Sequence, residues 1–447
     1  MIDWGEVQAV GVVGLGDTGY SVIEHLVRRK IKIQAFDLRM SPPCLDAVRE
    51  NFPQVEILLG ELNAIQIEYL DFLVLSPGID PRQTVLQDWK DQGRPIYGDV
   101  ELFCQEADAP IIAVTGSNGK STLVTMIGQA MLEAGKVAYV GGNIGQPVLP
   151  LLKKPKPDYY VLELSSFQLE SIHSLRQHIA VVANYSPDHL DRYCDFSEYV
   201  STKNRIYQNA RVAIVNCDQL DCVGRVAANS EIGFSVNAPA DFCVYSRNGV
   251  QVIRCKDQDL CAAAEVHPQG AHHWQNALIL LAVMHAANLS FDVGLDVIKS
   301  FEGLSHRCEL VSEKNAVSWY NDSKATNEGA TIAAIQSIAP SCEGKMILIA
   351  GGDAKGAELI DLKSIVSSEV DHVFVLGKDQ ELLFDLLSLV VKVECVESLD
   401  EAVASANQLA QSGDVVLLSP ACSSLDMFRD YQHRGEEFSK CIDELGE

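Results

Sequence analysis

The segment at 115–122, Thr-Gly-Ser-Asn-Gly-Lys-Ser-Thr, has the composition of a loop that binds phosphate, between the apolar run IIAV and a helical pattern. Backbone N–H groups of such a loop form an anion-binding nest, its lysine reaches the β- and γ-phosphates, and a hydroxyl can face Mg²⁺. Val114 replaces the first glycine of the full G-x-x-x-x-G-K-[ST] pattern, so the loop is a shortened variant. A plain turn is the alternative. The segment predicts an ATP site built from Gly116, Ser117, Asn118, Gly119, Lys120, Ser121 and Thr122.

Three further polar residues follow predicted strands of the same unit. Asn143 lies in the turn GGNIG, Glu163 ends the run YYVLE, and His189 lies in SPDHLDR. Because the carboxyl ends of parallel strands meet at one edge of a sheet, we expect these side chains around the phosphates. An acid, an amide and an imidazole there suit Mg²⁺ that keeps some of its waters. Taken singly, Asn143 could be a turn residue and His189 a capping or core residue.

A second phosphate signature stands near the start of the chain. GLGDTG at 14–19 is a G-x-G-x-x-G that follows one strand and opens a helix, and Asp37 ends the next strand where a ribose-binding acid is expected. Its glycines allow close approach to a diphosphate, so the nucleotide could be NAD or a UDP-sugar. The segment Ser76-Pro77-Gly78 ends another strand at the expected crevice. A merely structural turn is the alternative for both segments.

These motifs need parallel sheets to position them, and the rest of the sequence predicts such sheets. Short Val/Ile/Leu runs alternate with helical segments, a pattern typical of parallel sheets covered by helices. The chain is predicted to be α/β with three domains: 1–98, Rossmann-like; 99–304, a P-loop ATPase-type parallel sheet with a β-rich insert; and 305–447, Rossmann-like. The insert contains a hairpin turned at Asn248-Gly249, and a long helix is expected over about 275–287. The predicted strands are QAVGVVG, KIQAF, FLVLS, IIAVTG, VAYVG, YYVLEL, IAVVAN, RVAIVN, AVSWY, KMILIAGG, HVFVLG and DVVLLS.

Composition limits the classes of function. The 447 residues carry a formal net charge of −26, which argues against a general nucleic-acid or anionic-membrane surface but not against anionic ligands bound locally. The 13 cysteines include no C-x-x-C pair, so we expect reduced thiols. No signal-type segment opens the sequence and no apolar run is long enough for a membrane span. We therefore expect a soluble, cytoplasmic protein with no nucleic-acid partner and no membrane insertion.

Taken together, the motifs resemble a known family. The phosphate loop, GGNIG, LELSSFQLE and DHLDR resemble the Mur ligases of bacterial peptidoglycan synthesis, and the resemblance extends through all three domains. YNDSKATN at 320–327, GGDAKG at 351–356 and LLSPACSSLDMFRDYQHRGEEF at 417–438 resemble the members that add D-glutamate. The resemblance implies two nucleotide sites because two nucleotides are used. UDP-N-acetylmuramoyl-L-alanine would bind in the first domain and ATP in the second, and an acyl phosphate would be attacked by the amine of D-glutamate.

The resemblance also assigns roles to residues. It implies two Mg²⁺ ions, the first held by Ser121 and Glu163 and the second by His189 and a carbamylated Lys203. From the sequence alone, Lys203 would be a solvated helix lysine. For ATP, the further implied contacts are Asn276 with adenine, Arg307 with phosphate and Asp322 with ribose. Lys324 and Thr326 would meet the reacting acyl group and D-glutamate, and D-glutamate would also bind Lys355, Ser424, Leu425 and Tyr431. The implied contacts with the UDP substrate are Gly16, Asp17, Thr18, Asp37, Arg39, Ser76, Gly78 and Asn143. The implied catalytic set is Lys120, His189, Lys203 and Lys324, in a protein expected to be a monomer.

Three positions depart from the family pattern: His273 replaces an asparagine, Leu38 replaces a hydroxyl residue beside the uracil site, and Tyr431 stands where phenylalanine is frequent. KATN and SSLD are also good helix-start signals and could only cap helices. Sibling Mur ligases and folylpolyglutamate synthase share the ATP-dependent chemistry. An NAD-dependent oxidoreductase would leave Lys120, Glu163 and His189 unexplained, and a regulatory ATP-binding protein would hydrolyse ATP regardless of amino acids.

Overall fold

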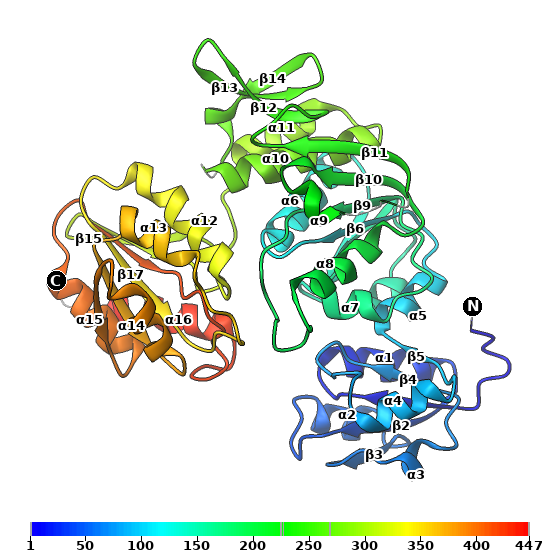
Figure 1. Cartoon of the computed structure of the whole chain (residues 1–447). Helices are drawn as coiled ribbons and strands as arrows, with labels where there is room; N and C mark the ends of the chain where they lie inside the picture. Colours follow the sequence, from blue (N-terminus) through cyan, green and yellow to red (C-terminus); the bar gives the residue numbers. More distant parts are fainter. Residues whose placement is uncertain (1, 224–225, 227, 268–269, 446–447) are drawn as a thin grey trace.

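The computed structural model describes residues 2–223, 226, 228–267 and 270–445. It contains three sheets that follow one another along the chain, each with its own helices (Figure 1). The predicted three-domain α/β architecture is confirmed, and each strand range predicted from the sequence contains a strand. None of the helices in the described ranges is long and apolar enough to cross a membrane. All thirteen cysteines lie in the described ranges as free thiols.

The first sheet is wholly parallel, with strand order β3-β2-β1-β4-β5. The order reverses between β1 and β4, and a crevice for ligands forms at the carboxyl ends of the strands at such a point. GLGDTG follows β1 and Ser76 follows β4, so the sheet brings the two segments to the same place. Its elements are β1 (Ala9–Val13), α1 (Asp17–Arg28), β2 (Lys32–Asp37), α2 (Leu45–Asn51), β3 (Glu56–Leu59), α3 (Ala64–Ile67), β4 (Phe72–Leu75), α4 (Thr84–Asp91) and β5 (Ile96–Tyr97).

The central sheet has strand order β14-β13-β12-β11-β10-β9-β6-β8-β7. It is parallel from β7 to β12, and the antiparallel strands β12 to β14 form the predicted insert at the far end (Figure 1). Asn248 and Gly249 have φ of 52° and 82°, as a tight hairpin turn requires. The strands are β6 (Ile111–Thr115), β7 (Ala138–Gly142), β8 (Tyr159–Glu163), β9 (Ile179–Val182), β10 (Ala210–Asn216), β11 (Ala228–Ser235), β12 (Phe242–Arg247), β13 (Val250–Cys255) and β14 (Gln258–Ala262).

Helices of the central unit pack on both faces of this sheet. The predicted long helix is α10, which begins at Ala271 rather than at 275 and contributes an unbroken buried run over 277–284. The helices are α5 (Asp99–Glu106), α6 (Lys120–Glu133), α7 (Ser166–Glu170), α8 (Phe196–Asn204), α9 (Leu220–Val223), α10 (Ala271–Ala286) and α11 (Phe291–Ser300).

The third sheet has strand order β15-β16-β20-β17-β18-β19 and is parallel except for β15, which pairs antiparallel with β16. Loops after β16, β17 and β20 carry the KATN, GGDAKG and SSLD segments to one edge. The elements are β15 (Glu309–Lys314), β16 (Val317–Asn321), α12 (Glu328–Ile338), β17 (Met346–Gly351), α13 (Leu362–Glu369), β18 (His372–Leu376), α14 (Gln380–Leu387), β19 (Lys392–Cys395), α15 (Leu399–Leu409), β20 (Val415–Leu418) and α16 (Tyr431–Glu444).

The hydrophobic cores divide the chain unevenly. One core runs from the first sheet through α5 to a face of the central sheet, and it includes Val12, Phe103 and Tyr160. The two cores of the third domain are built from residues at 308 and beyond. Apolar packing therefore joins the first domain to the central domain, whereas the contacts described below between the central and third domains are polar.

Gly351 offers a direct test of the third sheet. It has φ of +132°, and a Cβ there would lie 1.9 Å from the carbonyl oxygen of Leu376. Gly351→Ala is expected to lower the Tm by about 5–10 °C, because both backbone strain and a backbone clash must be relieved. Gly93→Ala is the control, since Gly93 has φ of +73° with nothing within 4 Å of a Cβ. Equal melting temperatures for the two variants would contradict this packing.

Candidate active site

The phosphate-binding loop connects β6 to α6 and is shaped by two glycines. Gly116 has φ of +152° and Gly119, the residue before α6, has φ of +74°. Asn184, which follows the neighbouring strand β9, holds the loop: its side-chain Oδ1 accepts from Asn118 N at 2.8 Å and its carbonyl accepts from Ser117 N at 3.0 Å. The loop is therefore fixed by the central domain itself, with backbone N–H groups at the start of α6 available to an anion.

Lys120 opens α6, and its Nζ donates to the carbonyl oxygen of Ser117 at 2.9 Å. Burial lowers the pKa of Lys120, and the nearby cations Arg307 and Lys355 lower it further, against the opposing effect of Glu163 and Asp188. A phosphate placed on the loop would relieve this repulsion among cations.

The other predicted side chains lie beside the loop because β8 and β9 flank β6 and β7 follows β8. Asn143 donates its Nδ2 to Oε1 of Glu163 at 2.7 Å. Oε2 of Glu163 is buried and has no hydrogen-bond partner among the described residues. A buried carboxylate oxygen without a partner is costly unless a cation or donor meets it, so this oxygen suits a metal ion.

His189 follows β9 in a left-handed backbone conformation, with φ of 57°. Its ring lies 4.7 Å from that of Phe167, and its Nε2 lies 3.6 Å from Oδ2 of Asp188. Burial lowers the pKa of His189 to about 4, with Lys355, Lys120 and Lys203 adding to the effect and Asp188 opposing it. The imidazole is therefore neutral near pH 7, which is the form that binds a metal.

Lys203, on α8, is buried rather than solvated and is only 2% exposed. Its Nζ donates to the carbonyl oxygen of Gly116 at 2.9 Å and lies 4.5 Å from the centre of the Tyr199 ring. Burial lowers the pKa of Lys203 well below its usual value, and Lys120 adds to this effect. The structure thus places a buried lysine against the phosphate loop, which the sequence alone did not indicate.

The third domain brings its own cations to this edge. Arg307 donates to Oγ of Ser121 at 2.7 Å, and Lys355 pairs with Oδ1 of Asp188 at 2.5 Å. This pair, together with His189 and a hydrogen bond from Asn327, lowers the pKa of Asp188 to about 2 although burial acts to raise it. Two positions that are 167 residues apart in the sequence are thereby joined across the domain boundary.

Lys324 and Asp322 flank Ser323 on the loop after β16. Nζ of Lys324 lies 4.0 Å from the centre of the Tyr431 ring, and burial together with Arg307 and Lys120 lowers its pKa to about 8. Asp322 accepts from Oγ of Ser419 at 2.7 Å, and burial raises its pKa to about 7.

The remaining predicted residues of these two domains lie close to the loops just described. Thr326 donates its backbone N–H to the carbonyl oxygen of Lys324 at 2.8 Å. Ser424 is buried and Leu425 is 71% exposed, both on the loop between β20 and α16. Asn276 is buried on α10 directly beneath the phosphate loop, where its Oδ1 lies 3.3 Å from a Cβ placed on Gly119.

In the first domain, Asp37 organises the glycine-rich turn. Its carboxylate is buried and accepts from Leu15 N at 2.7 Å and from Nη2 of Arg39 at 2.8 Å. Burial acts to raise the pKa of Asp37, but the bonds from Arg39 and Leu15 hold it below the usual value. Asp37 thus orients the partly exposed Arg39. Oγ of Ser76 donates to the carbonyl oxygen of Gly14 at 3.1 Å.

The other glycines of this site explain its open shape. A Cβ at Gly19 would lie 1.8 Å from the carbonyl oxygen of Gly14, so only glycine permits this approach of helix to strand. Gly16 and Gly78 face open space. Asp17 is exposed and Thr18 is half-buried at the start of α1.

Several residues of the site were not assigned roles from the sequence. They are Asp188, Asn184, Tyr199, Asn327 and Arg192. Nη1 of Arg192 donates to the carbonyl oxygen of Pro77 at 3.2 Å and so joins the first domain to the central one. Asp188 and Asn327 lie inside the DHLDR and KATN motifs, so their place in these motifs was the sequence signal that could have identified them. The described residues contain no group of three or more His, Cys, Asp or Glu side chains that could hold a metal. A Mg²⁺ ion here would therefore need water and phosphate oxygens in addition to the side chains of this edge.

Comparison with known proteins places the chain in one family along its length. Three family models match in order: "Mur ligase MurD-like, N-terminal domain" at 8–98, "Mur ligase middle domain" at 114–284 and "Mur ligase, glutamate ligase domain" at 306–422. Solved structures with a similar fold include a pseudomurein peptide ligase type C from Methanothermus fervidus. It has a TM-score of 0.64 at 16% identity, with 98% of this chain and 100% of that one covered. The MurF ligase from Thermotoga maritima has a TM-score of 0.63 at 16% identity, with coverage of 99% and 97%.

Curated relatives are similar over nearly the same span. The UDP-N-acetylmuramoylalanine--D-glutamate ligase of Pseudomonas aeruginosa is 42% identical over 439 residues, covering 97% of each chain. A protein of the same name from Pseudomonas putida is 43% identical over 435 residues, and the match covers 96% of each chain. Another from Coxiella burnetii is 40% identical over 435 residues, with 97% of this chain and 98% of that one covered. Because both the ordered family models and these relatives extend through all three sheets, the chain belongs to the Mur ligase family.

Proposed function

We propose that this protein is an ATP-dependent ligase that joins UDP-N-acetylmuramoyl-L-alanine to D-glutamate in peptidoglycan precursor synthesis. The observation that carries the proposal is the junction at which Lys355 and Arg307 of the third domain meet Asp188 and Ser121 beside the phosphate loop. The ligase reaction needs the amino acid and the nucleotide at one reaction centre, and this junction between the third domain and the phosphate loop supports such a centre. The curated relatives bear the name of this reaction.

The reaction needs a leaving group because a carboxylate is a poor acyl donor. The γ-phosphoryl group moves from ATP to a carboxylate oxygen of the sugar substrate, and ADP leaves. The amine nitrogen of D-glutamate then attacks the acyl carbon, a C–N bond forms, and the C–O bond to phosphate breaks as the amine loses a proton. The protein contributes alignment of three anionic reactants and neutralisation of the charge that develops.

Each domain takes one reactant. Residues 1–98 bind the UDP group through the glycine-rich turn, Arg39, Ser76 and Gly78, with Asn143 of the central domain reaching the sugar. Residues 99–304 bind ATP, with Lys120 on the phosphates and Asn276 on the adenine side. Residues 305–447 bind D-glutamate through Thr326, Lys355, Ser424, Leu425 and Tyr431, while Arg307 and Asp322 reach back to ATP phosphate and ribose. The proposed oligomeric state is a monomer, since one chain supplies residues for all three ligands. The proposed location is the cytoplasm.

Two Mg²⁺ ions would be held by four side chains, Ser121 and Glu163 on one ion and His189 and Lys203 on the other. When bound, such ions neutralise phosphate charge. The unpartnered Oε2 of Glu163 and the neutral imidazole of His189 support this assignment. Lys203 joins the set as a carbamate: its neutral amine attacks CO₂, an N–C bond forms, and one proton is released. This converts a buried amine into an anion beside the other metal ligands.

The activity is tested by phosphate release from Mg-ATP with UDP-N-acetylmuramoyl-L-alanine and, in turn, D-glutamate, L-glutamate, L-lysine or no amino acid. Turnover is expected with D-glutamate alone. Turnover with a different amino acid would assign the protein to a sibling ligase. Turnover that ignores both the sugar and the amino acid would leave a plain ATPase and contradict the proposal.

Lys324 gives a pH-dependent prediction. With a pKa of about 8, its ammonium is present below that pH and is lost above it. If the cation holds a carboxylate, kcat/KM for D-glutamate should fall by up to about tenfold per pH unit above 8 relative to Lys324→Arg, whose guanidinium stays charged. Comparing the two enzymes on one substrate cancels the titration of the D-glutamate amine. Lys90→Arg, at an exposed lysine, is the control and should show the pH profile of wild type. If kcat/KM falls with pH in parallel for wild type and Lys324→Arg, the cationic role of Lys324 is refuted.

The carbamate on Lys203 can be detected by NMR spectroscopy, without any assay of activity. Wild-type protein in ¹³C-bicarbonate should show a carbamate carbon resonance, because burial lowers the pKa of Lys203 and so favours the unprotonated amine that reacts with CO₂. The resonance should be absent from Lys203→Ala and kept by Lys90→Ala. A resonance that persists in Lys203→Ala would place the carbamate elsewhere, and its absence from wild type at saturating bicarbonate would remove it from the mechanism.

A further inference from the structure

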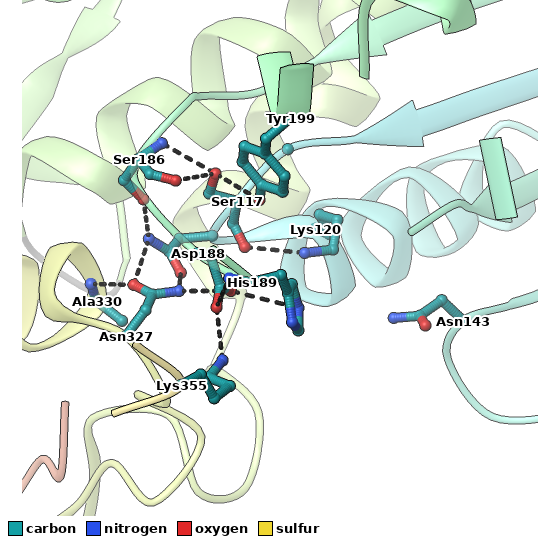
Figure 2. A network of polar contacts seen from close by, with 12 residues as sticks. Ser117, Lys120, Asn143, Ser186, Asp188, His189, Tyr199, Asn327, Ala330 and Lys355 are labelled. Atoms are coloured by element: carbon teal, nitrogen blue, oxygen red, sulfur yellow. Dashed lines mark hydrogen bonds and ion pairs between the residues drawn. The ribbon is translucent and has the colours of Figure 1, made fainter. Parts of the chain in front are cut away.

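Asn327 connects the third domain to the phosphate loop through one fully used amide. It precedes α12 and caps it, with Oδ1 accepting from Ala330 N at 3.0 Å. Across the domain boundary, Oδ1 of Asn327 also accepts from Nδ2 of Asn118 at 3.2 Å. In return, Nδ2 of Asn327 donates to Oδ1 of Asn118 at 3.0 Å. Nδ2 also donates to Oδ2 of Asp188 at 3.2 Å. Figure 2 shows Asn327 between Ala330 and Asp188, with Lys355 beyond the carboxylate.

We propose that Asn327 is a positioning residue that aligns the amino-acid domain on the phosphate loop, so that Lys355 is brought to the reacting groups in register. The proposal goes beyond the ligase activity and, in its kinetic part, rests on that proposed function. Asn327 touches no reactant in this scheme; it acts through Asn118 and Asp188.

The hydrogen-bonding inventory explains why an asparagine is needed. An amide has two donor hydrogens and two acceptor lone pairs, and here all four are used. The N–H of Ala330 and the carboxylate of Asp188 also fix which end of the amide is oxygen. An aspartate at 327 would keep the cap but face Oδ1 of Asn118 and the Asp188 carboxylate with a negative charge. A serine would keep the cap but lack the reach and the donors for the domain contact.

The contact reaches two working parts of the site. Asn118 is two residues from Lys120 on the phosphate loop, and the backbone of Asn118 is already held by Asn184. Loss of Asn327 therefore leaves the loop intact within the central domain. Asp188 accepts from Nδ2 of Asn327 at Oδ2 and from Nζ of Lys355 at Oδ1. The amide of Asn327 therefore also orients the carboxylate that binds Lys355.

Gly329 shows how closely the two domains approach at this point. It lies in the first turn of α12, and a Cβ there would be 3.0 Å from Cβ and Oγ of Ser186 and 3.4 Å from Nδ2 of Asn118. A methyl group at 329 would press the third domain away from the loop. Within the helix alone, alanine is favoured over glycine, so Gly329→Ala separates disturbance of the contact from loss of stability.

The first experiment compares kcat and KM of wild type, Asn327→Ser and Gly329→Ala in the phosphate-release assay. Both variants should melt within about 2 °C of wild type or higher, because cap and helix are kept. They should lower kcat/KM for D-glutamate by about ten- to one-hundred-fold, with less than about threefold change in the Kd for ADP. Asn63→Ser is the matched control, since Asn63 also caps a helix with a side chain that accepts locally from Gln66; it should behave as wild type.

A double-mutant cycle then tests whether Asn327 acts through Asn118. Asn118→Ala with Asn327→Ser should be no worse than the more damaging single change, because both remove the same contact. Additive losses in kcat/KM, or wild-type kinetics for Asn327→Ser, would overturn the proposal and leave Asn327 a simple helix cap.

Small-angle scattering reads the contact independently of the reaction. With a non-hydrolysable ATP analogue bound, Asn327→Ser and Gly329→Ala should show a larger radius of gyration than wild type and Asn63→Ser. Identical scattering curves would count against the domain contact. If wild type lacks D-glutamate-dependent turnover but the scattering difference is present, the ligase activity fails while the alignment of domains by Asn327 is upheld.

Discussion

Concentration of positive charge at one edge of the central sheet is the constraint on which this site depends. Lys120, Lys203, Lys324 and Arg307 face the same space as the carboxylates Glu163 and Asp188, in a chain whose net charge is −26. Burial makes a charged ammonium costly, and the lowered pKa values of Lys120, Lys203 and Lys324 express this cost. A site in this condition favours ligands that bring several negative charges. ATP, a UDP-linked carboxylate and D-glutamate are ligands of that kind.

The same constraint explains why the domains are joined in different ways. An apolar core that passes through α5 binds the first domain to the central domain, which suits a unit that holds one substrate steadily. The third domain meets the central domain through Arg307, Asn327 and Lys355, which are hydrogen-bonded to Ser121, Asn118 and Asp188 respectively. Because polar contacts of this kind can exchange with water at modest cost, the junction can open and close without disturbing either core.

The Asp188–His189 pair shows how neighbouring groups receive different protonation states. The pKa of Asp188 is lowered because Lys355 and His189 outweigh its burial, whereas burial and three lysines lower the pKa of His189. An anion and a neutral imidazole therefore stand side by side near neutral pH. The division lets Asp188 receive the third domain while the imidazole remains free to act as a ligand.

The sequence by itself determined the three α/β units and most of their strands, because hydrophobic period and glycine punctuation are local signals. It did not predict β3, β5, β11, β14, β15 or β19, which mostly lie toward the sheet edges and carry many polar or half-exposed residues. The loop at 115–122 and the turn at 14–19 follow strands as predicted, and Asn143, Glu163 and His189 lie at or beyond the ends of β7, β8 and β9, since spacing from a strand is also a local signal. Only the tertiary structure decided that Lys203 is buried, that Asp37 holds Arg39, and that Asn327 meets Asn118 from 209 residues away. Burial and pairing depend on which distant segments pack together, and no local pattern of residues records that.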